Sequence, residues 1–266
     1  MMPRRRLALV MLVLAAALQG GCKPVASPDD GRSPAARGFP RADRPVSKVI
    51  STQFSTEDQR DKLGEAKLVM EWSHIAPGMT LADIGAGEGY YTVRLAEKVG
   101  KTGRVLAEDI DPGALERLGR RIELDRLDNV SIKLGTSDDP RLPAASFDRI
   151  FVVHVDHEVA EPYAFLWYLR PALKPGGSVV VVDADRPTDA HGTPPDLLFC
   201  EFAAVGFRLV AFARNPGLSG YYARFEPMGP RPAPAAIRPC RLPGNPAGAQ
   251  AGAGTSVNLA DGSGGK

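Results

Sequence analysis

The sequence has few cysteines and almost no net charge, and each absence excludes a class of protein. Three cysteines in 266 residues, Cys22, Cys200 and Cys240, are too few for a disulfide framework or a cysteine-based zinc site. A formal net charge of +2, from 33 basic and 31 acidic residues, provides no basic face for nucleic acid. With 44% hydrophobic and 24% charged residues, the chain is typical of one globular domain with poorly packed ends.

The chain also begins without an apolar run long enough to cross a bilayer comfortably. Three arginines at residues 4–6 precede a short apolar run at residues 7–18, which is the order of an export signal. The run ends at LQGGC, where small residues precede Cys22, and this resembles the lipobox of bacterial lipoproteins. Gln19 stands where that pattern has leucine. An ordinary cleaved signal and an unlipidated anchor are therefore alternatives to lipidation of Cys22.

Composition divides the chain into four parts. Residues 1–22 are the lipoprotein-like signal peptide, and residues 23–50, rich in Pro, Gly, Ser, Asp and Arg, are expected to be a flexible linker. Residues 51–227 are the predicted folded domain, and residues 228–266, rich in Pro, Gly and Ala, the predicted disordered tail. We therefore expect a protein of the cell envelope, anchored to a membrane through an N-terminal lipid or signal, or a cytoplasmic protein if the signal is not functional.

Two cysteines outside the signal allow two interpretations. If Cys22 is lipidated, Cys200 and Cys240 are left to pair in an oxidising compartment. Cys200 also lies in the amphipathic pattern PPDLLFCEFAAVG, where a buried thiol behaves as a small apolar side chain. The pattern favours the second interpretation.

Apolar runs alternate with helical patterns, which predicts an α/β doubly wound fold. The near-continuous apolar runs RIFVV and SVVVVD are typical of strands buried on both faces of a parallel sheet. Two last strands joined by NPGLS form a hairpin that adds one antiparallel strand. The prediction is a Rossmann-like, mostly parallel, seven-stranded sheet. We expect strands at 80–84, 103–110, 129–134, 146–155, 178–185, 207–214 and 220–227, and helices at 54–75, 89–100, 111–127, 161–173 and 193–206.

A glycine-rich turn, DIGAGEGYY, follows the first expected strand and marks a ligand site. Backbone can approach a ligand closely where a strand, such a turn and a helix N-terminus meet. A dinucleotide fingerprint would place its third glycine at position 90, where Tyr90 stands, which disfavours pyrophosphate. S-adenosylmethionine has no phosphate but carries an ammonium, which Asp83 before the turn could meet. The next strand ends in EDID, where Asp109 could accept hydrogen bonds from both ribose hydroxyls.

Residues 80–187 resemble a class I S-adenosylmethionine-dependent methyltransferase, and the whole folded segment is similar to a bacterial subgroup of methyltransferase-domain proteins. The motifs that carry the resemblance are LADIGAGEGYYTVRLAEKVG, GRVLAEDIDPGAL, LGTSDDPRLPAASFDRIFVVHVDHEV and LKPGGSVVVVD. The resemblance implies S-adenosyl-L-methionine as cofactor. It also implies the terminal hairpin that was expected above from the strand pattern.

The resemblance assigns roles to matching residues. Asp83 would order the methionine ammonium, the turn would pass beneath the ligand, Asp109 would hold the ribose and Ile110 would pack on adenine. The family pattern GDAEDLP has an acid that reaches the adenine amino group, but here Thr136 and Ser137 stand at those places. Asp138, or the backbone near Ser137, could substitute. The expected cofactor-binding residues, including Tyr90 as a wall of the pocket, are Asp83, Gly85, Ala86, Gly87, Tyr90, Asp109, Ile110, Thr136, Ser137 and Asp138.

Histidines near the ends of the fourth and fifth strands are candidate general bases. Ligands of an open α/β sheet lie outside the carboxyl ends of its strands. The run HVDHEV presents His154 and His157, with Asp156 or Glu158 to orient an imidazole, and His191 follows the fifth strand. The alternative is a hydrogen-bonded structural role for each histidine. Spacing alone is weak support for a metal, so no metal site is predicted.

A helix before the first strand is expected to fold over the site. Arg60 and Glu65 on it are possible ligand contacts, although a solvated charged face is the favoured interpretation, and Trp167 is expected in the core. The predicted function is methyl transfer by in-line displacement to a small or lipophilic acceptor. The alternatives are a non-catalytic S-adenosylmethionine or nucleoside-binding envelope module and, disfavoured by Tyr90, a nicotinamide-dependent oxidoreductase. The sequence predicts no oligomeric state.

Overall fold

The computed structural model describes residues 31–48, 56–215, 218 and 220–241, so the predicted signal lies outside the described residues. The chain divides into a unit of residues 1–32 and a unit of residues 33–266, and the sheet and helices belong to the second. None of the helices in the described part of the chain is long and apolar enough to cross a membrane.

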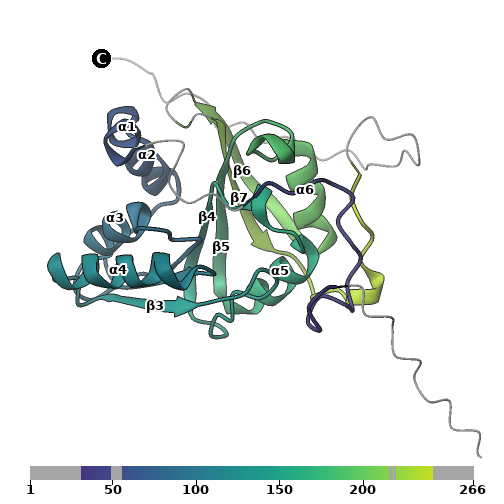
Figure 1. The fold of residues 1–266 in the computed structure, drawn as a ribbon, viewed down its shortest axis with the longest axis horizontal. Helices are drawn as coiled ribbons and strands as arrows, with labels where there is room; N and C mark the ends of the chain where they lie inside the picture. Colours follow the sequence, from purple (N-terminus) through teal and green to yellow (C-terminus); the bar gives the residue numbers. More distant parts are fainter. Residues whose placement is uncertain (1–30, 49–55, 216–217, 219, 242–266) are drawn as a thin grey trace, which may run out of the picture. The chain divides into compact units, whose positions relative to one another are not determined.

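One seven-stranded sheet organises the second unit, in the order β3-β2-β1-β4-β5-β7-β6 (Figure 1). Only β7 is antiparallel to its neighbours, β5 and β6, which confirms the predicted Rossmann-like, mostly parallel sheet with one antiparallel strand from a terminal hairpin. The strands are β1 (Thr80–Ile84), β2 (Arg104–Asp109), β3 (Val130–Leu134), β4 (Phe147–Val153), β5 (Leu173–Asp183), β6 (Phe207–Asn215) and β7 (Gly220–Pro227).

The strand order reverses between β1 and β4, which places a ligand crevice at their carboxyl ends. After β1 the chain moves outward through β2 to β3, and then crosses back so that β4 pairs with the other side of β1. In open α/β sheets the crevice at this switch point is where ligands bind. Asp83 of β1 lies in register with Ala107 of β2 and Phe151 of β4, one residue before the carboxyl end of β1.

Helices cover both faces of the sheet (Figure 1). On one face α2 (Glu65–Trp72) and α3 (Tyr90–Val99) pack against apolar side chains of the strands, α4 (Pro112–Leu124) packs on β2, and α1 (Glu57–Leu63) precedes α2. On the other face lie α5 (Pro162–Leu169) and α6 (Pro195–Ala204). The chain also makes short 3-10 turns at Asp156–Glu158, Arg170–Ala172, Thr188–Ala190 and Pro234–Ala236.

Local sequence explains where the first helices begin and end. Asp111 caps α4 by accepting a hydrogen bond from the Gly113 N–H at 2.8 Å, with Pro112 at the first helical position, as the sequence predicted. The single helix predicted at residues 54–75 is instead two helices. Gly64 adopts a left-handed φ of +69°, which ends α1 and turns the chain into α2.

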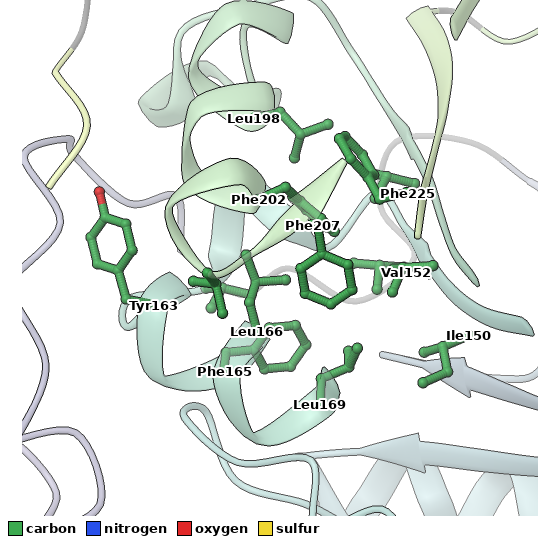
Figure 2. Packing of buried hydrophobic residues seen from close by; sticks show 14 of the residues in the cluster. Ile150, Val152, Tyr163, Phe165, Leu166, Leu169, Leu198, Phe202, Phe207 and Phe225 are labelled. Atoms are coloured by element: carbon green, nitrogen blue, oxygen red, sulfur yellow. The ribbon is translucent and has the colours of Figure 1, made fainter. Parts of the chain in front are cut away.

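The central strands are buried on both faces, as their apolar runs predicted. Ile150 and Val152 of β4 point toward α5 and α6, whereas Phe151 points toward α3. Figure 2 shows the first of these clusters, in which Phe202 of α6 stacks on Phe225 of β7 with ring centroids 3.9 Å apart. This two-sided burial fixes the strands and therefore the positions of the residues that follow them.

Residues 33–48 and 228–241 pack against the domain, in contrast to the flexible linker and disordered tail that composition predicted. Ala36 and Phe39 are buried in the cluster beneath α5 and α6, together with Ile237. Trp167, expected in the core, is half-buried between these two segments: its ring lies edge-on to Phe39 and its indole N–H donates to the Pro232 carbonyl at 2.8 Å. A few isolated apolar side chains suffice for docking, although they show no periodicity.

A buried arginine and a disulfide fasten these two segments. The Arg44 guanidinium donates to a Glu201 carboxylate oxygen at 2.9 Å and to the Asp156 and Val159 carbonyls. Cys240 forms a disulfide with Cys200 of α6, with Cα atoms 5.9 Å apart. The disulfide is the interpretation that the sequence disfavoured, because the helical pattern around Cys200 contained no information about the position of Cys240.

Loss of the disulfide should destabilise the domain. The bond joins residues 40 positions apart, so Cys240→Ser should lower the free energy of unfolding by about 4 kcal/mol, because the unfolded chain regains conformational freedom. Urea denaturation followed by circular dichroism measures this change, with Cys22→Ser as the matched control. Equal unfolding midpoints with and without dithiothreitol would contradict the expectation.

Candidate functional site

The glycine turn between β1 and α3 contains Gly85, Gly87 and Gly89. Two of these glycines pack closely against other residues, and the third has open space beside it. A Cβ atom at Gly85 would lie 2.4 Å from a Val155 methyl, and one at Gly89 would lie 2.5 Å from a Leu118 methyl. Gly87, with a φ of +55°, differs because a Cβ there would meet no protein atom within 4 Å. The backbone at Gly87 therefore borders open space, as a close-approaching ligand requires.

Asp109, the last residue of β2, is tied to this turn. One carboxylate oxygen accepts the Gly87 N–H at 2.8 Å, and the other accepts the Asp111 N–H at 2.9 Å. Each oxygen retains a further lone pair, so the group can accept additional hydrogen bonds from a ligand. The next side chain, Ile110, is 41% exposed. The structure thus brings Asp109, Ile110 and the turn together as the sequence predicted.

Two more carboxyl groups are buried beside the turn. Asp83 accepts a hydrogen bond from the Thr92 hydroxyl at 2.6 Å, and burial raises its pKa to about 6. Burial, with the neighbouring charge of Asp109, raises the pKa of Glu108 to about 8. A Cβ at Gly135 would overlap the Glu108 carboxyl group, so any side chain there would displace that group. Sequence reasoning missed Glu108, although the paired acids of EDID could have indicated it.

The loop after β3 engages its side chains outside the glycine turn. The Thr136 hydroxyl donates to the Asp139 carbonyl at 2.9 Å, which closes a small turn within the loop. The Asp138 carboxylate is buried and accepts a hydrogen bond from the Ser33 hydroxyl of the docked N-terminal segment. Ser137 between them is exposed. Among these three predicted adenine contacts, Ser137 is the one whose side chain faces solvent.

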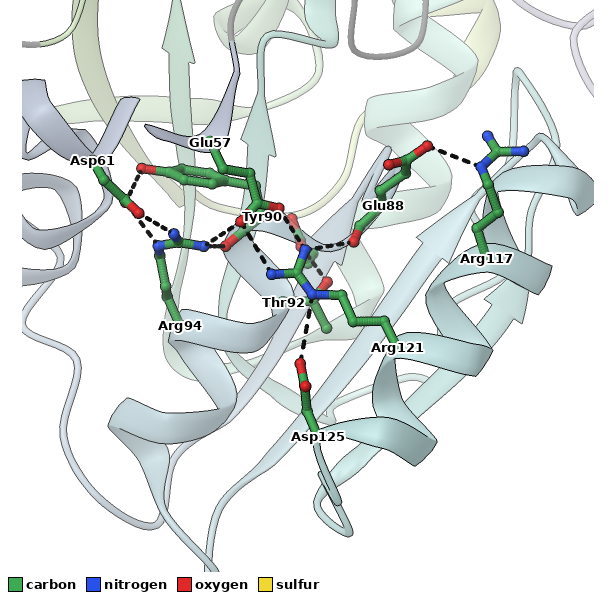
Figure 3. Close-up of polar contacts among 10 residues, drawn as sticks. Glu57, Asp61, Glu88, Tyr90, Thr92, Arg94, Arg117, Arg121 and Asp125 are labelled. Carbon is green, nitrogen blue, oxygen red and sulfur yellow. Dashed lines mark hydrogen bonds and ion pairs between the residues drawn. The ribbon is translucent and has the colours of Figure 1, made fainter. Parts of the chain in front are cut away.

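Tyr90 stands where a dinucleotide-binding motif has its third glycine, and its side chain contacts helix α1 (Figure 3). Its hydroxyl donates to Asp61 at 3.0 Å, and its ring lies between two guanidinium groups, of Arg60 and Arg94, each 3.9 Å from the ring centroid. Cation–π contacts of this kind stabilise both arginines over the ring. Tyr90 is 7% exposed. Through its hydrogen bond to Asp61 it connects α3, which it begins, to α1.

Ion pairs extend this attachment to α4. Arg121 of α4 donates to both carboxylate oxygens of Glu57 in α1, and its guanidinium also donates to the Glu88 carbonyl within the glycine turn at 2.9 Å (Figure 3). Arg117 pairs with the Glu88 side chain at 2.9 Å. Helix α1 therefore covers the turn through charged contacts rather than through an apolar face, since none of its residues is buried.

A buried acid links α2 to the histidine after β4. Glu65 accepts hydrogen bonds from Arg60 at 2.6 Å and from the Tyr91 hydroxyl at 3.0 Å, and its second oxygen lies 3.6 Å from His154 Nε2. Burial would raise the pKa of Glu65, but His154 and Arg60 outweigh burial and hold it at about 2. Glu65 is 2% exposed, so the solvated charged face predicted for this residue is wrong.

His157 is oriented by an acid that the sequence did not indicate. Its Nδ1 lies 3.0 Å from a carboxylate oxygen of Asp183, the fully buried last residue of β5. Burial would lower the pKa of His157, but the hydrogen bond and charge of Asp183 raise it. Asp156, proposed for this role from the sequence, instead accepts a hydrogen bond from Thr193 at 2.9 Å and faces Arg44. The partner was missed because it lies on another strand.

His191 lies beside His157. Their ring centroids are 5.6 Å apart with the rings perpendicular, although the two residues follow different strands. Both belong to the carboxyl edge of the sheet, as does His154, whose backbone N–H donates to Val182 of β5 at 2.8 Å. The three histidines that the sequence singled out are thus on neighbouring loops of one edge.

Comparison with known proteins shows that part of this chain is similar to methyltransferases. The profile of a family described as a methyltransferase domain matches residues 81–177. A protein-L-isoaspartate O-methyltransferase from Methanothrix thermoacetophila is 34% identical over 104 residues, 39% of this chain and 47% of that protein. A ubiquinone/menaquinone biosynthesis C-methyltransferase from Bordetella parapertussis is 31% identical over 170 residues, 56% of this chain and 61% of that protein. The chain spans about half to three-fifths of these relatives.

Solved structures agree on the fold. A SAM-dependent methyltransferase from Aquifex aeolicus superposes with a TM-score of 0.55 at 21% identity, covering 64% of this chain and 97% of that one. The [4+2]-cyclase SpnF superposes with a TM-score of 0.52 at 16% identity, covering 71% of this chain and 88% of that one. At these identities the likeness concerns the fold alone, and one fold hosts different reactions.

The raised pKa values of Glu108 and Asp83 predict how stability depends on pH. Each group binds its proton more tightly in the folded than in the unfolded chain, so its stabilising contribution is complete at low pH and is lost as pH rises toward about 6 for Asp83 and about 8 for Glu108. In the unmodified protein, ionisation of Glu108 should lower the free energy of unfolding by about 1 kcal/mol per pH unit between pH 5 and 7. Glu108→Gln should remove this decline.

Urea denaturation at several pH values measures that slope. Glu123→Gln, an exposed change on α4, is the matched control and should follow the unmodified protein. Parallel stability curves for Glu108→Gln and the unmodified protein would show that the buried carboxyl does not hold its proton.

Proposed function

We propose that the protein is a class I methyltransferase that transfers a methyl group from S-adenosyl-L-methionine to a small or lipophilic acceptor, and the match of residues 81–177 to the profile of a methyltransferase domain supports this proposal. The observation that carries the proposal is the open backbone at Gly87, held by the Asp109 carboxylate at the switch point of the sheet. The buried Asp83 carboxyl stands on the neighbouring strand.

The residues at the turn fit the chemistry of the cofactor. S-adenosyl-L-methionine supplies a methyl group on a positively charged sulfur, which a nucleophile displaces in line. We assign Asp83 to its ammonium, Asp109 to the ribose hydroxyls and the exposed Ile110 side chain to the adenine ring. The backbone of Gly85, Ala86 and Gly87 would pass beneath the bound cofactor. Two carboxyl groups suit a cationic amino acid better than a pyrophosphate.

His154 is the proposed general base for an acceptor that begins protonated. Its side chain is one-third exposed at the carboxyl edge, and a Glu65 carboxylate oxygen lies 3.6 Å from its Nε2. Because the pKa of Glu65 is held at about 2, this carboxylate remains charged at neutral pH. His157, the other candidate base, is 4% exposed and held by Asp183, so we place it in a supporting role.

Three observations support a lipophilic acceptor and a location at the cell envelope. The disulfide between Cys200 and Cys240 is typical of proteins in oxidising compartments, whereas cytoplasmic thiols stay reduced. The apolar run at residues 7–18 and Cys22 match a lipoprotein-like anchor. The Bordetella relative is named for quinone biosynthesis, and quinones are lipophilic. We therefore favour a lipophilic acceptor at a membrane surface over a cytoplasmic one.

A second candidate function is a non-catalytic envelope module that binds S-adenosyl-L-methionine or a related nucleoside. The same disulfide favours it, because an exported domain would seldom meet a charged cofactor that is made in the cytosol. Tight binding without methyl transfer to any fraction of a cell extract would favour this module over the enzyme.

Asp109→Ala should weaken cofactor binding by more than about tenfold, because it leaves ribose hydroxyls without their acceptor. Calorimetric titration of the purified protein with S-adenosyl-L-methionine and S-adenosylhomocysteine measures the affinity, and circular dichroism checks the fold. Asp128→Ala, exposed and before β3, is the matched control and should bind normally. Failure of the unmodified protein to bind either ligand would refute the proposed function.

His154→Asn should lower kcat by about 100-fold while cofactor affinity stays within about threefold, because a general base acts on the acceptor proton. Asparagine tolerates the left-handed φ of +57° at this position, so the backbone is preserved. Transfer of a radiolabelled methyl group to a lipid extract of the cell measures the rate. Equal rates for the variant and the unmodified protein would remove His154 from the reaction.

A further inference from the structure

Three side chains outside the proposed cofactor contacts converge at the carboxyl edge of β4 and β5. His157, Glu158 and His191 each offer one ligand atom, and these atoms lie within 4.8 Å of one another. We propose that they form a binding site for a divalent transition-metal ion, with Zn²⁺ as the best match. Ligand atoms on one zinc ion lie about 3.4 Å apart, given bonds of about 2.1 Å and tetrahedral angles. The half-buried side chains of Glu158 and His191 would therefore have to move closer to His157 when an ion binds.

The carboxylate behind His157 is the second observation that points to a metal. Asp183 is fully buried and lies 3.0 Å from Nδ1, so in the tautomer that donates Nδ1–H to this carboxylate the lone pair on Nε2 is left to bind a metal. A carboxylate that orients the far nitrogen of a histidine is the arrangement found behind metal-bound histidines. The Ala184 N–H donates to the same carboxylate at 2.8 Å and fixes its position.

The docked N-terminal segment fastens together the two loops that carry the ligands. The Ser47 N–H donates to the His157 carbonyl at 3.1 Å, and the Ser47 hydroxyl accepts the His191 N–H at 3.2 Å. The Thr188 hydroxyl donates to the Pro45 carbonyl at 2.7 Å. One segment thus holds both loops at a fixed separation, which reduces the conformational freedom that a metal would have to remove.

The donor set indicates the class of ion and its use. Two imidazoles and one carboxylate form the ligand set of catalytic zinc sites, which keep a further position for water or substrate. Glu158 and Asp183 together offset the charge of a divalent cation. If the proposed methyl transfer is correct, an ion here could lower the pKa of a bound acceptor hydroxyl or thiol. The binding site itself does not depend on that reaction.

Calorimetric titration of the chelator-treated, full-length protein with ZnCl₂ alone tests the site. We expect one ion per chain, and an affinity at least about 100-fold lower in His191→Asn and about tenfold to 100-fold lower in Asp183→Asn. His191 has a left-handed φ of +56°, which asparagine tolerates. His74→Asn is the matched control, because His74 is an exposed histidine with a left-handed φ of +53°.

Cobalt substitution gives a readout that does not depend on activity. Co²⁺ in a site with two imidazoles should give visible absorption bands in the unmodified protein and in His74→Asn, and weaker bands in His191→Asn and Glu158→Gln, whose changes lie at half-buried positions that folding tolerates. Absence of stoichiometric zinc binding, or equal binding by His191→Asn and His74→Asn, overturns the proposal. Because no acceptor or methyl donor is present, these results are independent of the proposed methyl transfer.

Discussion

Buried carboxyl groups at the carboxyl edge of the sheet determine how the turns and loops around them are arranged. Asp83 lies one residue before the end of β1, Glu108 and Asp109 are the last two residues of β2, and Asp183 is the last residue of β5. A carboxyl group taken out of water must be hydrogen-bonded, paired or protonated. The glycine turn, the start of α3 and the loop after β4 accordingly place donors against these groups, and His157 is held by one of them.

Much of the fold could be predicted because its signals are local. A run such as SVVVVD shows two-sided burial, and the glycines of DIGAGEG mark the turn that follows. Gly64 shows the limit of this reasoning: a glycine inside a helical pattern is tolerated or ends the helix according to contacts that the pattern does not contain. Here α1 is held by Arg94 and Arg121, far along the chain, and this fixes the break.

The partners of the site residues could not be read from spacing, because they lie on other strands or in the terminal segments. His157 and Asp183 are 26 residues apart, and Arg44 and Glu201 are 157 apart. The sequence offered only the nearby acids Asp156 and Glu158 for His157, and Asp156 contacts Arg44 and Thr193 instead. Composition likewise failed for residues 33–48, because docking depends on single anchors such as Phe39 rather than on a periodic face.

The same edge explains why a cationic ligand suits this turn better than a dinucleotide. Burial raises the pKa of Asp83 to about 6 and that of Glu108 to about 8, so burial by itself disfavours the charged form of both carboxyl groups. A pyrophosphate would add negative charge beside Asp83 and Asp109, whereas the ammonium and sulfonium of S-adenosyl-L-methionine favour ionised neighbours. Tyr90, which packs between Arg60 and Arg94, directs those guanidinium groups onto its ring and onto acids of α1 and α2. The two guanidinium groups are therefore paired within the protein. The preference of the turn for a cationic ligand follows from the acids near the ends of β1 and β2.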